Sequence, residues 1–192
     1  MSDVALTFDD GPDPQWTPKV LDLLAADGAG ATFFVLGPRA SAHPSLIRRM
    51  VADGHEVALH AERHLRHSEL SGEEIAQDAG AVLTRLADLG ASPTRWRTPW
   101  GVQTPHTEEV AGELGLELCG WTADSRDWTG DPPAEMLLRC APGVVDGSVV
   151  LMHDGLGPGA TRRDCEGTVE LTRRLIGLAR ERGMTARSLE DR

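Results

Sequence analysis

Short apolar runs alternate with longer amphipathic segments along the whole chain. Several of the short runs are almost continuously apolar, which is typical of parallel strands covered on both faces. We expect seven strands, at residues 4–8, 31–36, 55–60, 94–97, 116–121, 148–153 and 184–187. Between them, the pattern predicts helices at residues 17–27, 44–53, 71–89, 107–114, 133–142 and 166–182.

Capping signals support the boundaries of these helices. Thr17-Pro18 and Asp131-Pro132 each read as an N-cap residue followed by proline at the first helical position. Ser71 and Glu74 fit a capping box, in which each side chain bonds the backbone of the other. Glycine follows each predicted helix end within one or two residues, where it can adopt the left-handed conformation at little cost.

The alternation of strands and helices predicts a parallel α/β fold, either an open wound sheet or a partly closed (β/α) barrel. No internal repeat, low-complexity stretch or long linker divides the sequence. We therefore expect residues 1–192 to form a single domain.

The amino-acid composition limits the classes of binding partner that we expect. Lys and Arg number 19 against 30 Asp and Glu, so the formal charge is −11, and 40% of the residues are hydrophobic. These values are typical of a soluble globular protein and argue against binding to nucleic acid or to an anionic membrane. The first residues carry no basic segment followed by a long apolar run, so we expect a cytoplasmic location. Secretion is the alternative if a signal peptide was removed.

Unusual polar residues follow two of the buried strands. Asp9 and Asp10 come directly after the first strand; His60 ends the third strand, and His64 follows it. Adjacent carboxylates repel one another, so a nearby cation is a natural explanation, although a simple turn would also use Asp. Two histidines at this spacing commonly grip a metal, the alternative being solvated surface histidines. Two His and one carboxylate suit hydrolytic zinc and also non-haem iron.

Candidate catalytic residues also lie at or after the ends of three further strands. Arg97 ends the fourth strand and Trp100 follows it, where both could also simply pack at the edge of the barrel. Asp127 follows the fifth strand, and His153 ends the sixth. A histidine at such a place is a plausible proton carrier with Asp127 as the carboxylate that tunes it. Because the carboxyl ends of parallel strands meet at one face, the sequence predicts one site there.

The sequence resembles the polysaccharide deacetylase family, carbohydrate esterase family 4, along nearly its whole length. Five motifs occur in the family's order: Thr7-Phe-Asp-Asp-Gly-Pro12, His60-x-x-x-His64, Arg97-x-Pro-Trp-Gly101, Asp124-Ser-Arg-Asp-Trp128 and Val150-Leu-Met-His-Asp154. The resemblance implies a distorted, incomplete (β/α) barrel with about seven parallel strands. It also implies a metal-dependent N-deacetylase.

The resemblance implies the metal site and the base. Asp10, His60 and His64 would bind a divalent metal; we expect zinc, with cobalt, nickel or manganese as alternatives. Asp9 would be the general base that takes a proton from the attacking water. Arg97 would hold Asp9 ionised and aimed by a charge-assisted hydrogen bond.

The same resemblance implies the remaining roles. The backbone N–H of Trp100 would stabilise the oxyanion. His153 would protonate the departing amine, with Asp127 orienting and raising its imidazolium form. Trp128 and Leu151 would wall a small pocket for the acetyl methyl group.

The sequence departs from the family pattern at two places. Ala61 stands where Ser or Thr usually follows the first metal histidine, and Trp100 stands where Tyr or Phe is usual. His67 is an alternative ligand to His64 if the loop shifts. The glycine-rich segment 155–164 is either a mobile substrate loop or a long solvated connection.

The predicted substrate is an N-acetylated amino sugar or a related small N-acetylated metabolite. Tryptophans make up most of the aromatic residues, and their faces suit stacking on sugar rings. An iron oxygenase with the same three ligands and a non-catalytic carbohydrate-binding relative are the competing interpretations. The separate acid–base pair argues against the first, and the complete set of catalytic side chains argues against the second. The oligomeric state is not readable from the sequence.

Overall fold

The computed structural model describes residues 2–190. Parallel strands form one sheet, which is curled into an incomplete barrel. The strands are β1 (Asp3–Asp9), β2 (Thr32–Leu36), β3 (Glu56–Ala61), β4 (Arg95–Trp96), β5 (Glu117–Leu118), β6 (Ala123–Asp124), β7 (Ser148–His153) and β8 (Thr185–Arg187). The fold expected from the sequence is confirmed.

β1 lies at the centre of the sheet. The strand order is β5-β4-β3-β2-β1-β7-β6, and β8 pairs with β1 beside this path. The first half of β1 pairs with β8, and its second half pairs with β2. All of these pairings are parallel, so the carboxyl ends of the strands open onto the same face.

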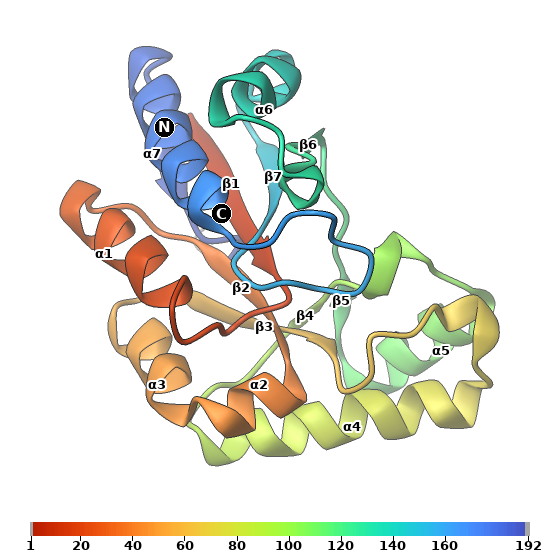
Figure 1. Ribbon diagram of the computed structural model, residues 1–192. Helices are drawn as coiled ribbons and strands as arrows, with labels where there is room; N and C mark the ends of the chain where they lie inside the picture. The colour runs from red at the N-terminus through yellow and green to blue at the C-terminus, as the bar shows by residue number, and fades with distance from the viewer. Residues whose placement is uncertain (1, 191–192) are drawn as a thin grey trace.

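Helices surround the sheet on its outer side (Figure 1). They are α1 (Thr17–Asp27), α2 (Gly37–Ala42), α3 (Pro44–Ala52), α4 (Gly72–Asp88), α5 (Pro105–Leu114), α6 (Pro133–Cys140) and α7 (Glu166–Glu181). Four short 3-10 turns complete the described elements: η1 (His67–Glu69), η2 (Pro99–Gly101), η3 (Asp127–Thr129) and η4 (Ala141–Gly143). No helix within residues 2–190 is long and apolar enough to cross a membrane.

Residue alternation along β1 separates the core from the site. Val4, Leu6 and Phe8 belong to the hydrophobic core beneath the helices. Thr7 and Asp9 point to the opposite side of the strand, as expected from the period of two. The interior of the half-barrel is therefore polar near the carboxyl end of its central strand.

The predicted fifth strand, 116–121, is present only at Glu117–Leu118, and the structure adds a strand that was not predicted, β6, at Ala123–Asp124. β5 pairs with β4, whereas β6 pairs with β7 at the other edge of the sheet. The residues between β5 and β6 therefore cross the gap between the two edges. A pattern of apolar residues cannot report such a crossing, because the periodicity of each short piece is unchanged.

The helix caps agree with the sequence in part. The Ser71–Glu74 capping box is present at the start of α4. Thr17 is not an N-cap, because the cap position of α1 is Trp16 and the Thr17 hydroxyl bonds Asp154 instead. Asp131 is not a cap either, since its carboxylate pairs with Arg139. In both cases a tertiary partner took the polar side chain. α2 was not predicted.

Candidate active site

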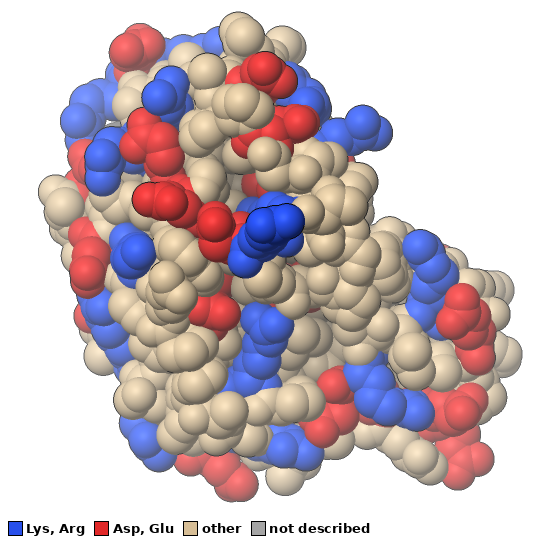
Figure 2. Space-filling view, in the orientation of Figure 1, with Lys and Arg blue, Asp and Glu red and all other residues tan. Residues whose placement is uncertain are grey.

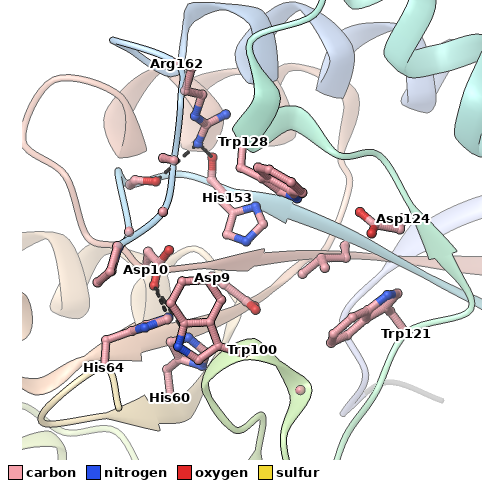
Figure 3. A pocket seen from close by; sticks show the side chains of 17 residues that line it. Asp9, Asp10, His60, His64, Trp100, Trp121, Asp124, Trp128, His153 and Arg162 are labelled. Atoms are coloured by element: carbon pink, nitrogen blue, oxygen red, sulfur yellow. Dashed lines mark hydrogen bonds and ion pairs between the residues drawn. The ribbon is translucent and has the colours of Figure 1, made fainter. Parts of the chain in front are cut away.

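A cavity of about 290 Å³ opens at the carboxyl ends of the strands. Its walls come from segments far apart in the sequence: the end of β1, the loops after β3 and β4, the region around η3, and the loop after β7. Figure 3 shows the labelled side chains around this cavity. The site predicted at the strand ends therefore lies where parallel α/β folds build sites.

Asp10, His60 and His64 converge at one side of the cavity. One ligand atom from each lies within 4.8 Å of the others. Asp10 Oδ1 is 3.5 Å from His60 Nε2 and 3.3 Å from His64 Nε2. Zinc–ligand bonds of about 2.0–2.2 Å in a tetrahedron place neighbouring ligand atoms about 3.3–3.6 Å apart. The two distances from Asp10 Oδ1 agree with this spacing between zinc ligands.

The polar atoms of this cluster are also short of partners. Asp10 Oδ1 is buried and has no hydrogen-bond partner within the described residues. Burial opposes ionisation of this carboxyl, but the neighbouring His60, His153 and His64 outweigh it and lower the pKa of Asp10 to about 2. A buried anionic oxygen facing two imidazole nitrogens fits a bound metal cation.

The ring of His60 is held in one orientation. Its Nδ1 lies 2.6 Å from the carbonyl oxygen of Arg97, to which it donates, so that Nε2 is free to face Asp10. This backbone carbonyl orients the ring although Ala61 offers no hydroxyl. His67, the alternative to His64 as a metal ligand, is not part of this cluster. Its Nδ1 bonds the Thr107 hydroxyl at 3.0 Å, and its ring packs against Trp96.

Asp9 and Arg97 form a buried pair beside the cluster. Arg97 Nη1 donates to Asp9 Oδ1 and to the Thr7 hydroxyl, each at 2.8 Å, and Nη2 donates to the carbonyl oxygen of Gly120. The guanidinium also lies over the ring of Phe34, 4.1 Å from its centre. These contacts fix the Asp9 carboxylate and leave Oδ2 without an arginine partner, so that it is available to accept a proton.

His153 and Asp127 form a second buried pair. His153 Nδ1 donates to Asp127 Oδ1 at 2.7 Å, which leaves Nε2 for the cavity. Burial opposes the imidazolium form, but Asp127 above all, then Asp9 and Asp10, raise the pKa of His153 to about 9. Burial would also raise the pKa of Asp127, yet His153 and Arg162 hold it well below its usual value. The pair is therefore an imidazolium and a carboxylate at neutral pH.

Among residues 2–190, three residues other than glycine adopt a left-handed backbone, and all three lie in the motifs of this site. They are Asp10 with φ 70°, Trp100 with φ 61° and Arg126 with φ 52°. Successive residues of a strand point to opposite faces, so the turn at Asp10 lets two adjacent carboxylates reach one cavity. Such conformations cost about 1–2 kcal/mol, and they gather where a function requires them.

Trp100, Trp128 and Leu151 all line the cavity. Trp100 and Trp128 are 41% and 36% exposed, so part of each side chain is accessible from the cavity. Trp100 also packs edge-on against His64 and lies under the Arg66 guanidinium.

Sequence reasoning missed three lining residues: Trp121, Asp124 and Arg162. The first two lie in or beside a quoted motif, which was the signal that could have found them. Arg162 lies in the glycine-rich segment 155–164, which the sequence indicated as a possible substrate loop without singling out this residue.

The fold and the site together define a class: parallel α/β half-barrels that hold candidate metal ligands and acid–base side chains in one cavity at the carboxyl edge of the sheet. The chain belongs to the polysaccharide deacetylase family, whose model matches residues 2–119. The family expected from the five motifs is confirmed.

Known relatives agree with this assignment. The chain is 40% identical over 170 residues to a chitooligosaccharide deacetylase of Bradyrhizobium sp. (strain ANU 289), covering 86% of this chain and 76% of that protein. It is 38% identical to a chitooligosaccharide deacetylase of Sinorhizobium fredii, covering 97% and 89%. A family 4 carbohydrate esterase from Streptomyces lividans, solved in complex with acetate, superposes with a TM-score of 0.87 at 27% identity, covering 96% and 91%.

Proposed function

We propose that the protein is a metal-dependent hydrolase that removes the acetyl group from an N-acetylated amino sugar or a related small N-acetylated metabolite. One observation carries the proposal: the cavity lined by the three-ligand cluster is also lined by Asp9 and His153, and each of these is paired with a buried partner, Arg97 and Asp127 respectively. Amide hydrolysis needs a base for the water and an acid for a poor leaving group.

Asp10, His60 and His64 would hold the metal, which we propose to be zinc. When bound, a zinc ion supplies Lewis-acid polarisation of the acetyl carbonyl and a lowered pKa for water. Oxygen and imidazole ligands also accept cobalt, nickel or manganese.

The protein's own side chains supply the proton transfers. Asp9 accepts the proton of the attacking water at Oδ2, because Oδ1 is occupied by Arg97. His153 donates from Nε2 to the leaving nitrogen, because Nδ1 is bonded to Asp127. The backbone N–H of Trp100 stabilises the developing oxyanion, and Trp128 and Leu151 enclose the acetyl methyl group.

Support for the substrate class comes from the relatives and from the cavity. The two bacterial relatives carry the name chitooligosaccharide deacetylase. The cavity is lined by three tryptophans, and tryptophan faces stack on sugar rings. We propose an oligosaccharide or small-molecule substrate, with no nucleic acid or membrane as partner.

The first experiment measures acetate release from chitooligosaccharides, peptidoglycan fragments and small N-acetylated metabolites, together with metal content. We expect Asp9→Asn and His153→Ala each to lower acetate release by at least about 10²-fold while metal content stays unchanged. Asp10→Ala should abolish metal retention. Full activity of Asp9→Asn would show that the base is assigned wrongly, and bound iron with oxygen-dependent turnover would favour the oxygenase alternative.

A further inference from the structure

The loop between β7 and α7 returns to the pair formed by His153 and Asp127. Arg162 from this loop donates from Nη1 to Asp127 Oδ2 at 2.8 Å, and from Nη2 to the carbonyl oxygens of His153 at 2.9 Å and Gly155 at 3.2 Å. Its side chain is 5% exposed. Figure 3 shows Arg162 beside His153, with the two carbonyl contacts dashed. One guanidinium thus joins η3, the end of β7 and the loop.

The two oxygens of Asp127 have different partners. Oδ1 accepts from His153 Nδ1 at 2.7 Å, whereas Oδ2 accepts from Arg162, from the backbone N–H of His153 at 2.9 Å and from the Thr168 hydroxyl at 2.6 Å. The three partners of Oδ2 fix the rotation of the carboxylate. Oδ1 is therefore aimed at the imidazole, whatever occupies the cavity.

Charge explains why one of those partners is an arginine. Asp127 is fully buried, and a buried carboxylate that loses its cation is strongly destabilised. The other cation in contact with it is the imidazolium of His153, which becomes neutral when it gives up its proton. Arg162 stays charged through this step. It can hold Asp127 in place in both states of the histidine.

We propose that Arg162 is a positioning residue for proton donation by His153: it keeps the Asp127 carboxylate fixed and compensated while the imidazole changes charge. This rests on the deacetylase function proposed above. In that step the Nε2–H bond of His153 breaks and the proton bonds to the leaving nitrogen. The electron pair of the breaking C–N bond becomes the lone pair of the amine, while a lone pair of the oxyanion re-forms the C=O bond of the released acetate. No other reactant is needed.

The proposal makes leaving groups behave differently. An amine cannot depart without a proton, so hydrolysis of an N-acetyl group depends on the acid. 4-Nitrophenolate departs without protonation, so hydrolysis of 4-nitrophenyl acetate does not. A residue that acts through His153 therefore affects the amide alone, whereas damage to the cavity affects both substrates.

The test compares Arg162→Met, Arg162→Lys and Arg163→Met in the zinc-loaded protein. Arg163 lies in the same loop and is exposed. Arg163→Met is therefore a control that removes the same charge from the loop. For an N-acetylglucosamine oligomer we expect Arg162→Met to lower kcat by about 10–10²-fold with KM within about twofold. Hydrolysis of 4-nitrophenyl acetate should change by less than about threefold. Arg162→Lys should recover part of the loss, and Arg163→Met should match the wild type.

Two results would overturn the proposal: equal losses on both substrates, which mean a packing role only, or unchanged amide hydrolysis. If the wild type releases no acetate from any amide, the deacetylase proposal fails by itself. Nitrogen-15 NMR of the His153 ring then decides the role of Arg162 without turnover. We expect a protected Nδ1–H resonance in the wild type that is lost in Arg162→Met. Identical spectra would contradict the role of Arg162.

Discussion

His153 carries a proton at neutral pH because a buried carboxylate lies at its Nδ1. Burial alone would favour the neutral ring, but Asp127 raises the pKa of His153 to about 9. The imidazolium is present below this pKa and is lost as the pH rises through it. We therefore expect kcat/KM of the wild type to decrease with rising pH, with a midpoint at or below about pH 9. In Asp127→Asn the same fall should move at least about one pH unit lower.

The measurement is a pH profile of acetate release for both proteins, supported by NMR titration of the His153 ring. An alkaline limb that stays in place in Asp127→Asn would mean that Asp127 does not set the charge of His153.

Asp154 is another buried carboxyl, but its pKa is raised, whereas that of Asp127 is lowered. It is fully buried and accepts a hydrogen bond from the Thr17 hydroxyl. Burial, its largest influence, raises the pKa of Asp154 to about 7. The folded chain therefore keeps a proton that the unfolded chain releases near pH 4. The stability that this proton contributes is complete below about pH 4 and is lost as the pH rises to about 7.

Asp154→Asn should remove this dependence. Between pH 5 and 7, the unfolding free energy of the wild type should fall relative to that of Asp154→Asn by up to about 1.4 kcal/mol per pH unit. Urea unfolding at both pH values, with the same zinc concentration, measures the difference. A difference that does not change with pH would contradict the assignment.

At the scale of elements, the loop after β7 forms one wall of the site. Arg39 in α2 donates to the carbonyl oxygen of Leu156 at 2.8 Å, and Arg162 donates to the carbonyl oxygen of the neighbouring Gly155. Glycine is required for the close approach: a Cβ on Gly157 would lie 1.9 Å from Asp10 Oδ2, and one on Gly159 would lie 2.8 Å from the Trp100 ring. The glycine-rich segment therefore contacts both the candidate metal cluster and the aromatic wall.

Gly157→Ala should therefore disturb the metal cluster. The new methyl group would push against the Asp10 carboxylate, so we expect zinc affinity to fall by at least about 10-fold, as for changes next to metal ligands. Gly80→Ala in α4 is the matched control, because nothing lies within 4 Å of its added Cβ and alanine favours a helix by about 1 kcal/mol. Zinc titration checks both variants. Equal affinities would mean that the loop gives way easily.

At the scale of the whole molecule, a metal would tie β1 to the loop after β3. A ligand that binds only the folded chain stabilises it, by about 2.7 kcal/mol at 100 times its Kd. For a domain of this length, such a gain raises Tm by roughly 5–11 °C. We expect this rise on adding zinc to the metal-free wild type, and no rise in Asp10→Ala. Calorimetry measures both, and an equal rise in the variant would place the stabilising zinc elsewhere.

The surface carries both acidic and basic residues (Figure 2), although acidic residues are more numerous in the sequence. Figure 2 shows acidic and basic residues interspersed over the face that it presents. The net charge of −11 is therefore not gathered into one field on that face. The cytoplasmic location, the single domain and the absence of nucleic-acid and membrane partners stay predictions.

The sequence predicted the sheet and most helix boundaries because apolar periodicity and glycine stops are local signals. It predicted one strand at 116–121 and missed β6 at the other edge of the sheet, and it assigned Thr17 and Asp131 as caps. Those errors have one cause: strand pairing and the partner of a polar side chain depend on residues far away in the chain.

The sequence by itself determined where the chemistry gathers, because parallel strands bring their carboxyl ends to one face and five motifs follow such ends. The choice of Asp10 as the carboxylate that joins His60 and His64 came from the resemblance to the family. Only the tertiary structure decided that His67 turns away to Thr107 and that Arg162 reaches back to Asp127. The direction of a loop side chain depends on what packs against it. That packing exists only when distant segments have come together.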